Sequence, residues 1–248
     1  MRKIFIAISL LGLTDPIQAQ HHLEVNPFIG TGGHGHTFPG AVMPFGMVQL
    51  SPDTRTEGWD ACSGYHYSDT TLLGFSHTHL SGTGVGDYCD ILVTPRAVTN
   101  IDFSKTENLI TPIHFKKSEE KAHAGFYQVR LDQENIIARL TATDRTGVHE
   151  YQFDRADTKV IVINLRHRDK VLKAFVHQSK NFVTGSTLQR VPQGVPVGGN
   201  EPHQGYLDHS ELHILLADVA LFPAEHFDQH PFAAGIDDLE LGIAGHLG

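Results

Sequence analysis

The stretch Gly125-Phe-Tyr-Gln-Val-Arg-Leu131 alternates apolar with polar side chains. The alternation returns in Ile136-Ile-Ala-Arg-Leu-Thr-Ala142 and again in Gly147-Val-His-Glu-Tyr-Gln-Phe153. A period of two places every second side chain on one face of a strand, so each stretch is predicted to be a β-strand with one buried face. Short strands about ten residues apart, with no amphipathic helix between them, predict an all-β fold, namely a sandwich or barrel of antiparallel sheet.

Two apolar runs flank this group of strands. Lys159–Leu165 is apolar almost throughout, as a buried central strand would be. Asp90–Thr94 is a shorter apolar run, and we expect Pro95 to end that strand. Residues 20–180 contain no linker and no internal repeat, so we expect them to form one domain.

The amino terminus has the pattern of an export signal. Arg2 and Lys3 precede the apolar run Ile4–Leu13, which is too short to span a bilayer, and Ile17-Gln-Ala19 fits a cleavage site. We therefore expect residues 1–19 to be a signal peptide. A buried amino-terminal helix is the alternative, and we consider it the weaker one.

The two cysteines, Cys62 and Cys89, bear on the same question. An exported protein meets an oxidising compartment, where cysteines can pair. Two cysteines are no disulfide framework, and sequence alone does not show whether they lie close together. Their pairing therefore stays open at this stage.

The formal charge of −9 is not spread evenly along the chain. Lys and Arg stop at Arg190, while acidic residues continue to Glu240, so residues 1–190 are balanced and residues 191–248 carry the excess. A neutral body gives no reason to expect nucleic acid or an anionic membrane surface as a partner.

Residues 30–90 hold half of the chain's 24 glycines, interleaved with histidine, aromatic and serine residues. Glycine lets the backbone approach a ligand closely, while the other side chains supply stacking faces and hydrogen-bonding groups. This composition predicts a wall that faces a polar ligand. A phosphate loop is a weak alternative, because Gly30-Thr-Gly-Gly-His-Gly35 lacks the Gly-Lys-Ser/Thr ending and a following helix.

Two histidine pairs stand out, His34-Gly-His36 and His77-Thr-His79. In an extended segment this spacing puts both imidazoles on one face. Such pairs can contact a polar ligand, which we favour, or bind zinc, or be satisfied structural histidines. A catalytic zinc site also needs a third ligand. The candidates, by proximity in sequence only, are Asp60, Asp87 and Asp90.

Trp59 is the only tryptophan and lies between Gly58 and Asp60 rather than in an alternating strand. It could anchor the core, or it could be a stacking platform for the apolar face of a sugar ring. In the second case, Asp60 would accept hydrogen bonds from sugar hydroxyls. The residues alone do not favour either role for Trp59.

Four motifs, in order, resemble the start of family 92 glycoside hydrolases, the exported bacterial exo-acting alpha-mannosidases. They are Val25–Ala41, Pro44–Asp53, Gly64–Tyr67 and Gly74–Gly84. The resemblance continues more loosely through Gly125-Phe-Tyr-Gln-Val129 and Leu140-Thr-Ala-Thr143 to about Thr184. Cys89 departs from the pattern, which has glycine there.

The resemblance implies an amino-terminal β-sandwich, residues 20–184, packed on a larger helical barrel with the sugar between them. It also implies inverting hydrolysis of terminal alpha-mannosides, alpha-1,2-linked as on N-glycans or mannans, by an acid and a base that both lie in the barrel. Calcium is implied for the complete enzyme, with ligands mostly outside this chain. The chain would then carry no catalytic residue and would act in the periplasm or outside a bacterium.

On this interpretation six residues border the terminal mannose subsite: His34, His36, Trp59, Asp60, His77 and His79. The partners are a mannose-terminated glycan and the helical barrel. A non-catalytic carbohydrate-binding β-sandwich is the alternative function. A small zinc hydrolase built on the histidine pairs is a third.

The resemblance fails past Thr184. A segment rich in glycine and proline follows, and then a stretch with six histidines and no Lys or Arg. A shifted reading frame or a truncated gene product is the favoured explanation, and a metal-binding tail around His226 and His230 is the other. We expect residues 185–248 to be irregular or disordered and to add no strand to the sandwich.

Overall fold

The computed structural model describes residues 25–99, 107–154, 158–168, 170–178, 182–190, 207–215 and 240–245. Over these ranges the chain consists of β-strands and loops, with short 3₁₀ turns such as η2 (Trp59–Ala61) and η4 (Lys117–Glu119). All strand pairings are antiparallel. The predicted all-β, antiparallel fold is therefore confirmed.

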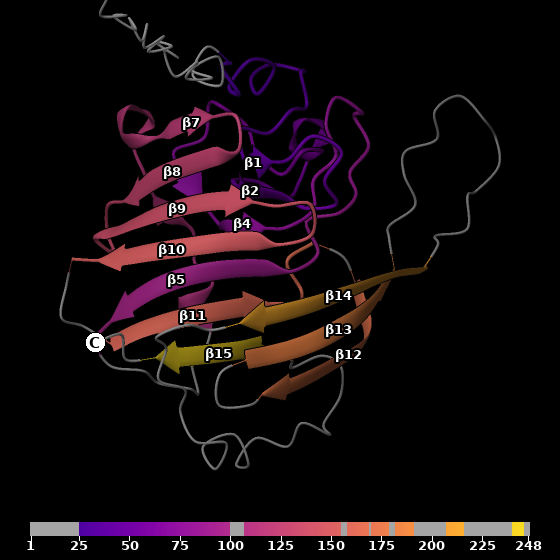
Figure 1. Cartoon of the computed structure of the whole chain (residues 1–248), viewed down its shortest axis with the longest axis vertical. Helices are drawn as coiled ribbons and strands as arrows, with labels where there is room; N and C mark the ends of the chain where they lie inside the picture. The colour runs from indigo at the N-terminus through magenta and orange to yellow at the C-terminus, as the bar shows by residue number, and fades with distance from the viewer. Residues whose placement is uncertain are drawn as a thin grey trace, which may run out of the picture.

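Two sheets carry most of the fold (Figure 1). The larger has the order β1-β2-β4-β5-β11-β15, and the smaller has the order β10-β9-β8-β7. The strands of the larger sheet are β1 (Ala41–Val42), β2 (Gln49–Asp53), β4 (Gly74–Ser76), β5 (Leu92–Val98), β11 (Thr158–Asn164) and β15 (Glu240–Gly245). Those of the smaller sheet are β7 (Lys121–His123), β8 (Phe126–Leu131), β9 (Ile136–Ala142) and β10 (Gly147–Phe153).

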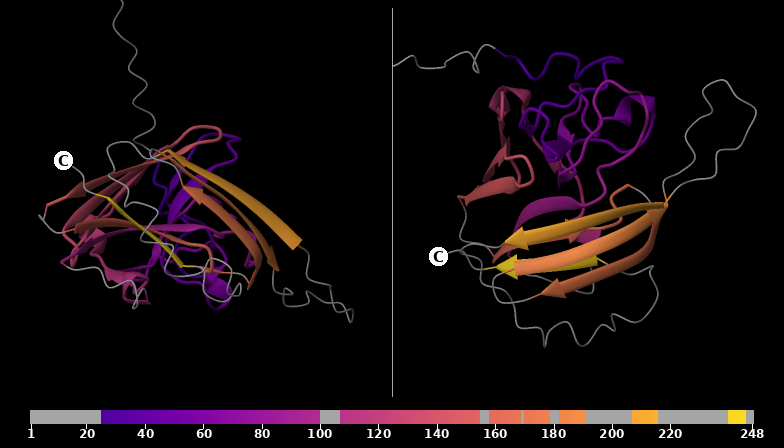
Figure 2. Two further views of the ribbon diagram at one scale, coloured as in Figure 1. Left: turned by 90° about the horizontal axis from the view of Figure 1, so that it is seen from below. Right: turned by 45° about the vertical axis from the view of Figure 1, so that its right-hand side comes forward.

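A two-stranded and a three-stranded sheet complete the structure. The first pairs β3 (Thr71–Leu72) with β6 (Ile113–His114). The second has the order β12-β13-β14, formed by Lys170–Gln178, Phe182–Arg190 and Leu207–Leu215. Both views of Figure 2 show these three strands as a separate curved layer.

The main core lies between the two large sheets. Leu50 of β2 and Phe75 of β4 pack in one buried cluster with residues of β8 and β9 from the smaller sheet. Those residues are Tyr127, Val129, Leu131, Ile136, Ala138 and Leu140. Burying each large apolar side chain contributes about 1.5–3 kcal/mol, so this contact between the sheets is a main source of stability. It is the face-to-face contact of a β-sandwich.

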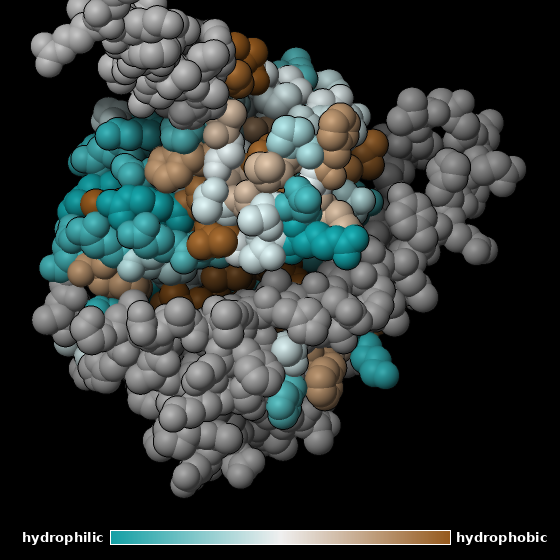
Figure 3. All heavy atoms as spheres, in the orientation of Figure 1, coloured by the Kyte–Doolittle hydropathy of each residue, from teal (hydrophilic) through white to brown (hydrophobic). Residues whose placement is uncertain are grey.

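The alternating stretches form strands where they were predicted. β9 and β10 have the expected bounds, and β8 begins one residue after Gly125. β8 and β9 bury every second side chain, which leaves the other face polar. In Figure 3, hydrophilic residues (teal) accordingly gather on the left of the view, over these strands.

The expectation that Pro95 ends its strand is wrong, because β5 runs through it to Val98. Proline cannot donate a ladder hydrogen bond, so it is tolerated only where one side of the strand is unpaired. The pairing of β5 with β4 covers only Leu92 and Val93, whereas the pairing with β11 continues along the whole strand. Within the part of the chain that the structure describes, β5 is therefore paired on one side only at Pro95.

The carboxy-terminal segment also differs from expectation. β13 continues past Thr184 to Arg190, β14 pairs with it along its full length, and β15 pairs with β11. The expectation that residues 185–248 are irregular and add no strand is therefore wrong for these elements. Backbone pairing along an available strand edge supplies hydrogen bonds even where the side chains do not alternate. The rest of this segment lies outside the described residues.

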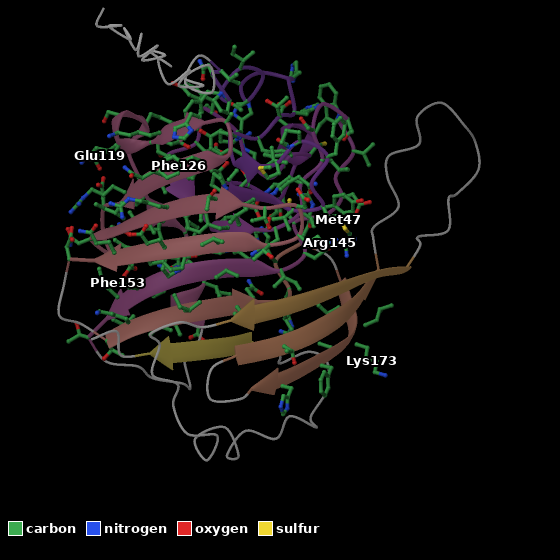
Figure 4. The ribbon with its side chains drawn as sticks, in the orientation of Figure 1. Met47, Glu119, Phe126, Arg145, Phe153 and Lys173 are labelled. Atoms are coloured by element: carbon green, nitrogen blue, oxygen red, sulfur yellow. The ribbon has the colours of Figure 1, made fainter. Side chains whose placement is uncertain are left out.

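The loop between β1 and β2 exposes apolar side chains. Met43 and Met47 are largely exposed, and Phe45 is fully exposed. The backbone N–H of Met47 donates to the carbonyl of Asp144 at 2.7 Å, and Figure 4 shows Met47 beside Arg145 at that end of the sheet. Among the described residues, no helix has the length and apolarity to cross a membrane.

Candidate functional site

Four of the six predicted site residues form one cluster, which we call the surface cluster: His34, His36, Trp59 and Asp60. The Oδ1 atom of Asp60 lies 2.7 Å from Nδ1 of His34 and 3.2 Å from Nε2 of His36. The Trp59 ring contacts both imidazoles, with centroid distances of 5.0 Å to His34 and 4.4 Å to His36. A carboxylate and an indole are thus held side by side.

The backbone that carries the surface cluster is a pair of tight turns. Gly33 and His36 both have positive φ, 58° and 52°, so the segment is a turn and not extended, and the two histidines converge through that turn. Gly58, with φ 86°, leads into η2, which presents Trp59 and Asp60. Glycine adopts such angles without strain, which explains part of the glycine content here.

The surface cluster is partly open to solvent. Trp59 is 59% exposed, and the side chain of Asp60 is 30% exposed. Trp59 Nε1 donates to the carbonyl of Gly84 at 3.2 Å, which fixes the plane of the indole. Hydrogen bonds from His34 first, and then from His36, lower the pKa of Asp60, so it is a carboxylate at neutral pH. An exposed aromatic face beside a fixed carboxylate can hold a ring that is apolar on one face and carries hydroxyls.

His79 lies in a second group, which we call the buried cluster: Asp53, Ser76, His79, Cys89 and His167. His79 Nε2 lies 2.7 Å from Oδ1 of Asp53, and His79 Nδ1 lies 2.7 Å from the carbonyl of Gln49. Oδ2 of Asp53 accepts from the Ser76 hydroxyl at 2.7 Å and lies 2.9 Å from Nε2 of His167. The side chains of Asp53 and His79 have no exposed surface.

Charge in the buried cluster is balanced locally. Burial alone would raise the pKa of Asp53, but the charge of His79 and hydrogen bonds from His167 and His79 hold it well below its usual range. Burial alone would lower the pKa of His79, but Cys89 and Asp53 raise it to about 10. In the absence of another ligand, Asp53 and His79 therefore form a buried ion pair.

His77 lies apart from both clusters. The chain bends at His77, directly after β4, so His77 and His79 do not face one side. Nε2 of His77 lies 3.0 Å from Nε2 of His149, whose Nδ1 is 2.7 Å from the hydroxyl of Tyr151. Burial, followed by the charge of His79, lowers the pKa of His77 to about 4, so the pair is neutral at ordinary pH.

Sequence reasoning missed two residues of this region, His167 and Arg168. Arg168 Nη1 donates to Cys89 Sγ at 3.6 Å, and its Nη2 donates to the carbonyl of Ala61 at 3.3 Å. Both residues follow β11, and the only local signal was a group of charged residues after an apolar strand. Cys62 and Cys89 are both free and buried, so they form no disulfide.

Comparison with protein families places this geometry in context. The profile of the glycosyl hydrolase family 92 N-terminal domain matches residues 24–207. The match extends beyond Thr184, so the family's pattern reaches further than the motifs alone indicate. A curated relative, an uncharacterized secreted glycosidase of Arthroderma benhamiae, is 28% identical over 135 residues, which are 52% of this chain and 17% of the relative.

Solved structures give the same family. A family GH92 alpha-mannosidase of Bacteroides thetaiotaomicron superposes with a TM-score of 0.60 and 25% identity, over 89% of this chain and 32% of that one. A family GH92 inverting mannosidase of Bacteroides thetaiotaomicron VPI-5482 has a TM-score of 0.51 and 20% identity, over 87% and 29% of the two chains, and so shares the fold. The present chain spans about a third of the length of these solved relatives.

Proposed function

The chain belongs to the family of the glycosyl hydrolase family 92 N-terminal domain, and on that premise we propose that it is the sugar-contacting part of an alpha-mannosidase. The proposed substrates are terminal alpha-mannosides, alpha-1,2-linked as on N-glycans or mannans, hydrolysed with inversion. We include export in the proposal, with residues 1–19 as signal peptide and the periplasm or exterior of a bacterium as the place of action. Residues 1–19 lie outside the described residues.

One observation carries the proposal: the surface cluster presents an exposed indole next to an oriented carboxylate. Trp59 would stack on the apolar face of the terminal mannose, and Asp60 would accept hydrogen bonds from its hydroxyls. His34 and His36 hold Asp60 at 2.7 and 3.2 Å, so they orient the acceptor before the sugar arrives. His77 and His79 lie away from this cluster, and we now assign them no contact with the sugar.

The acid and the base are proposed to lie in the helical barrel, the second partner of this domain. The loop between β1 and β2 supports such a partner, since Met43, Phe45 and Met47 of this one loop are all exposed. Exposed apolar side chains favour contact with another protein surface. In the proposal, the barrel covers this loop and closes the sugar site from the opposite side.

Calcium, expected for the complete enzyme, does not fit the residues described here. Calcium takes about six to eight oxygen ligands. The surface cluster offers Asp60 with two imidazoles, and the buried cluster offers Asp53 with an imidazole and a thiol. Neither set is a calcium site, which supports the proposal that the calcium ligands lie mostly in the barrel.

Fluorescence offers a direct test, because Trp59 is the only tryptophan. Methyl alpha-mannoside is expected to change the emission of the purified chain in a saturable way, with weak affinity because half of the site is absent. Methyl alpha-galactoside is the matched control and is expected to have no such effect. An emission spectrum that mannoside leaves unchanged at its solubility limit contradicts the assignment of Trp59.

A carbohydrate-binding sandwich without a catalytic partner is the second candidate, since the Trp59 face is accessible in this chain by itself. Its affinity for mannosides would not depend on a second domain. Micromolar or tighter binding by the isolated chain therefore favours this candidate, whereas weak binding favours the divided enzyme site.

A further inference from the structure

Cys89 occupies a position that the backbone reserves for glycine. Its φ is 61°, in the left-handed region that side chains with a Cβ adopt at a cost. The Cys89 side chain is fully buried. A strained backbone persists where the surrounding structure holds it, and such positions concentrate at functional sites. The Cys89 thiol is therefore a candidate functional group.

The thiol lies among donors that converge on one point. Asp53 Oδ1, His79 Nε2 and Cys89 Sγ all lie within 4.8 Å of one another. A tetrahedral zinc site, with bonds of about 2.0–2.3 Å, separates its ligand atoms by roughly 3.3–3.7 Å, so small side-chain movements would suffice. A thiolate, an imidazole and a carboxylate are ligands that zinc takes, whereas magnesium and calcium avoid sulfur.

We propose that Asp53, His79 and Cys89 bind a structural zinc ion inside the sandwich. All three residues are buried, so the ion would hold loops together and would not meet a substrate. Asp53 ends β2, His79 follows β4, and Cys89 precedes β5, so the ion would tie together the connections of three neighbouring strands. This role is independent of sugar binding at the surface cluster.

The surroundings of each ligand support the proposal. The Nδ1–H of His79 is directed at the carbonyl of Gln49, 2.7 Å away. Nε2, which lies 2.7 Å from Asp53 Oδ1 in the ion pair, is therefore the nitrogen that would bind zinc after losing its proton. Oδ2 of Asp53 is held by Ser76 and lies 2.9 Å from His167, so Oδ1 is the oxygen left for the metal. Metal ligands in proteins are oriented by such outer partners.

Two further groups lie beside the ligand atoms. Arg168 Nη1 donates to Cys89 Sγ at 3.6 Å, which orients the sulfur. Gly64 has φ 75°, and a Cβ at this residue would collide with Oδ1 of Asp53 and lie 3.0 Å from Cys89 Sγ. Glycine at this position keeps the space beside both ligand atoms free.

The fourth zinc position would be taken by a water molecule. Three protein ligands with a water are typical of catalytic zinc, so the structural role proposed here is argued from the burial of the ligands and not from their number. The hydroxyl of Ser76 lies 3.2 Å from His79 Nε2 and is the group at hand to hold that water.

The surface cluster is the rival metal site, since His34, His36 and Asp60 also lie within 4.8 Å of one another. Its donors include no thiolate, and the side chain of His34 is 70% exposed. A test must therefore separate the two clusters. Cobalt does so, because cobalt bound to a thiolate gives a charge-transfer absorption that imidazole and carboxylate ligands do not give.

The experiment measures metal content and cobalt spectra of the purified full chain. After equilibration with zinc and gel filtration, we expect zinc close to one equivalent, and replacement by cobalt should produce the thiolate charge-transfer band. Cys89→Gly should lose both signals while remaining folded, since glycine suits the backbone at this position. Cys62→Ser, which changes the other buried cysteine, and His34→Ala, which changes the surface cluster, should keep both signals.

The outcomes are distinct. Loss of zinc and of the cobalt band only in Cys89→Gly supports the site. Zinc retained by Cys89→Gly but lost by His34→Ala would place the metal in the surface cluster and overturn the proposal. A chain that takes up no zinc and gives no cobalt band would overturn it too, and would leave Asp53 and His79 as an ion pair alone.

Discussion

The surface cluster and the buried cluster are built from the same residue types, yet they have opposite relations to solvent. In each, one aspartate meets two histidines: Asp60 meets His34 and His36, and Asp53 meets His79 and His167. The side chain of Asp60 is 30% exposed, whereas that of Asp53 is fully buried. The two clusters therefore differ in burial and not in composition. The exposed carboxylate can contact a ligand, whereas the buried carboxylate stabilises the fold.

The physical reason is the cost of removing charge from water. A carboxylate at the surface keeps part of its hydration and can exchange its partners for the hydroxyls of a ligand. A buried carboxylate has lost that hydration, so each partner becomes obligatory. The comparison therefore predicts a large loss of stability from an Asp-to-Asn substitution in the buried cluster and almost none in the surface cluster.

The largest expected effect is that of Asp53→Asn. The amide would remove the charge that His79 requires and would direct N–H groups at donors, so the free energy of unfolding should fall by about 3–5 kcal/mol. Urea denaturation followed by circular dichroism measures it. Asp60→Asn is the matched control, and its stability should stay within about 0.5 kcal/mol of wild type. Equal losses in the two variants would show that burial does not distinguish the clusters.

Trp59→Ala should have the next largest effect, on binding and not on stability. If the indole lies under the sugar, its loss should cost about 1–3 kcal/mol of mannoside binding free energy. Affinity is measured by ligand-observed NMR, since the variant has no tryptophan. Phe45→Ala, at an exposed aromatic residue outside the cluster, should bind mannoside as wild type does. A variant that unfolds would show that Trp59 is a core anchor instead.

The sequence predicts the sandwich well where packing follows a simple period. β8, β9 and β10 alternate because one face of each meets the core or the opposite sheet, and that regularity is visible without coordinates. The predictions for Pro95 and for the carboxy-terminal strands are wrong for another reason. Whether a β-strand can contain a proline, or form without alternating side chains, depends on the strand that pairs with it. Pairing between distant parts of the sequence leaves no local pattern.

The surface cluster was predictable in its members but not in its geometry. His34 and His36 meet Asp60 as a group, but they do so through a turn with positive φ at His36. The identical spacing of His77 and His79 leads to two separate environments because the chain bends after β4. His167 reaches Asp53 across 114 positions of sequence, a contact that only the folded topology produces.

A smaller effect is expected from pH, through His149. Burial, and then the charge of His77, lower the pKa of His149 well below 6.5 in the folded state. The unfolded state therefore binds a proton at a higher pH than the folded state does, so the free energy of unfolding falls as pH drops below about 6.5, while the folded protein still holds His149 neutral. The slope from this group should be at most about 1.4 kcal/mol per pH unit, measured as unfolding free energy between neutral pH and pH 5.

The control for this prediction is His149→Gln, which keeps hydrogen-bonding groups beside His77 and Tyr151 but does not titrate. Its unfolding free energy should fall less steeply with acid than that of wild type, whatever its value at neutral pH. Equal slopes of the free energy of unfolding against pH in the two proteins would contradict the prediction, because His149 would then bind its proton equally well in the folded and unfolded states.

The smallest expected signal is hydrolysis by the chain alone, which should not exceed that of buffer. Inverting hydrolysis needs an acid and a base about 6.5–9.5 Å apart on opposite sides of the anomeric carbon. Each cluster contains a single carboxylate, and Asp53 is enclosed while Asp60 is held by two imidazoles. The assay uses an aryl alpha-mannoside with calcium present, and Asp60→Asn is the control variant. Turnover well above buffer that Asp60→Asn abolishes would place the chemistry in this domain and remove the need for the barrel.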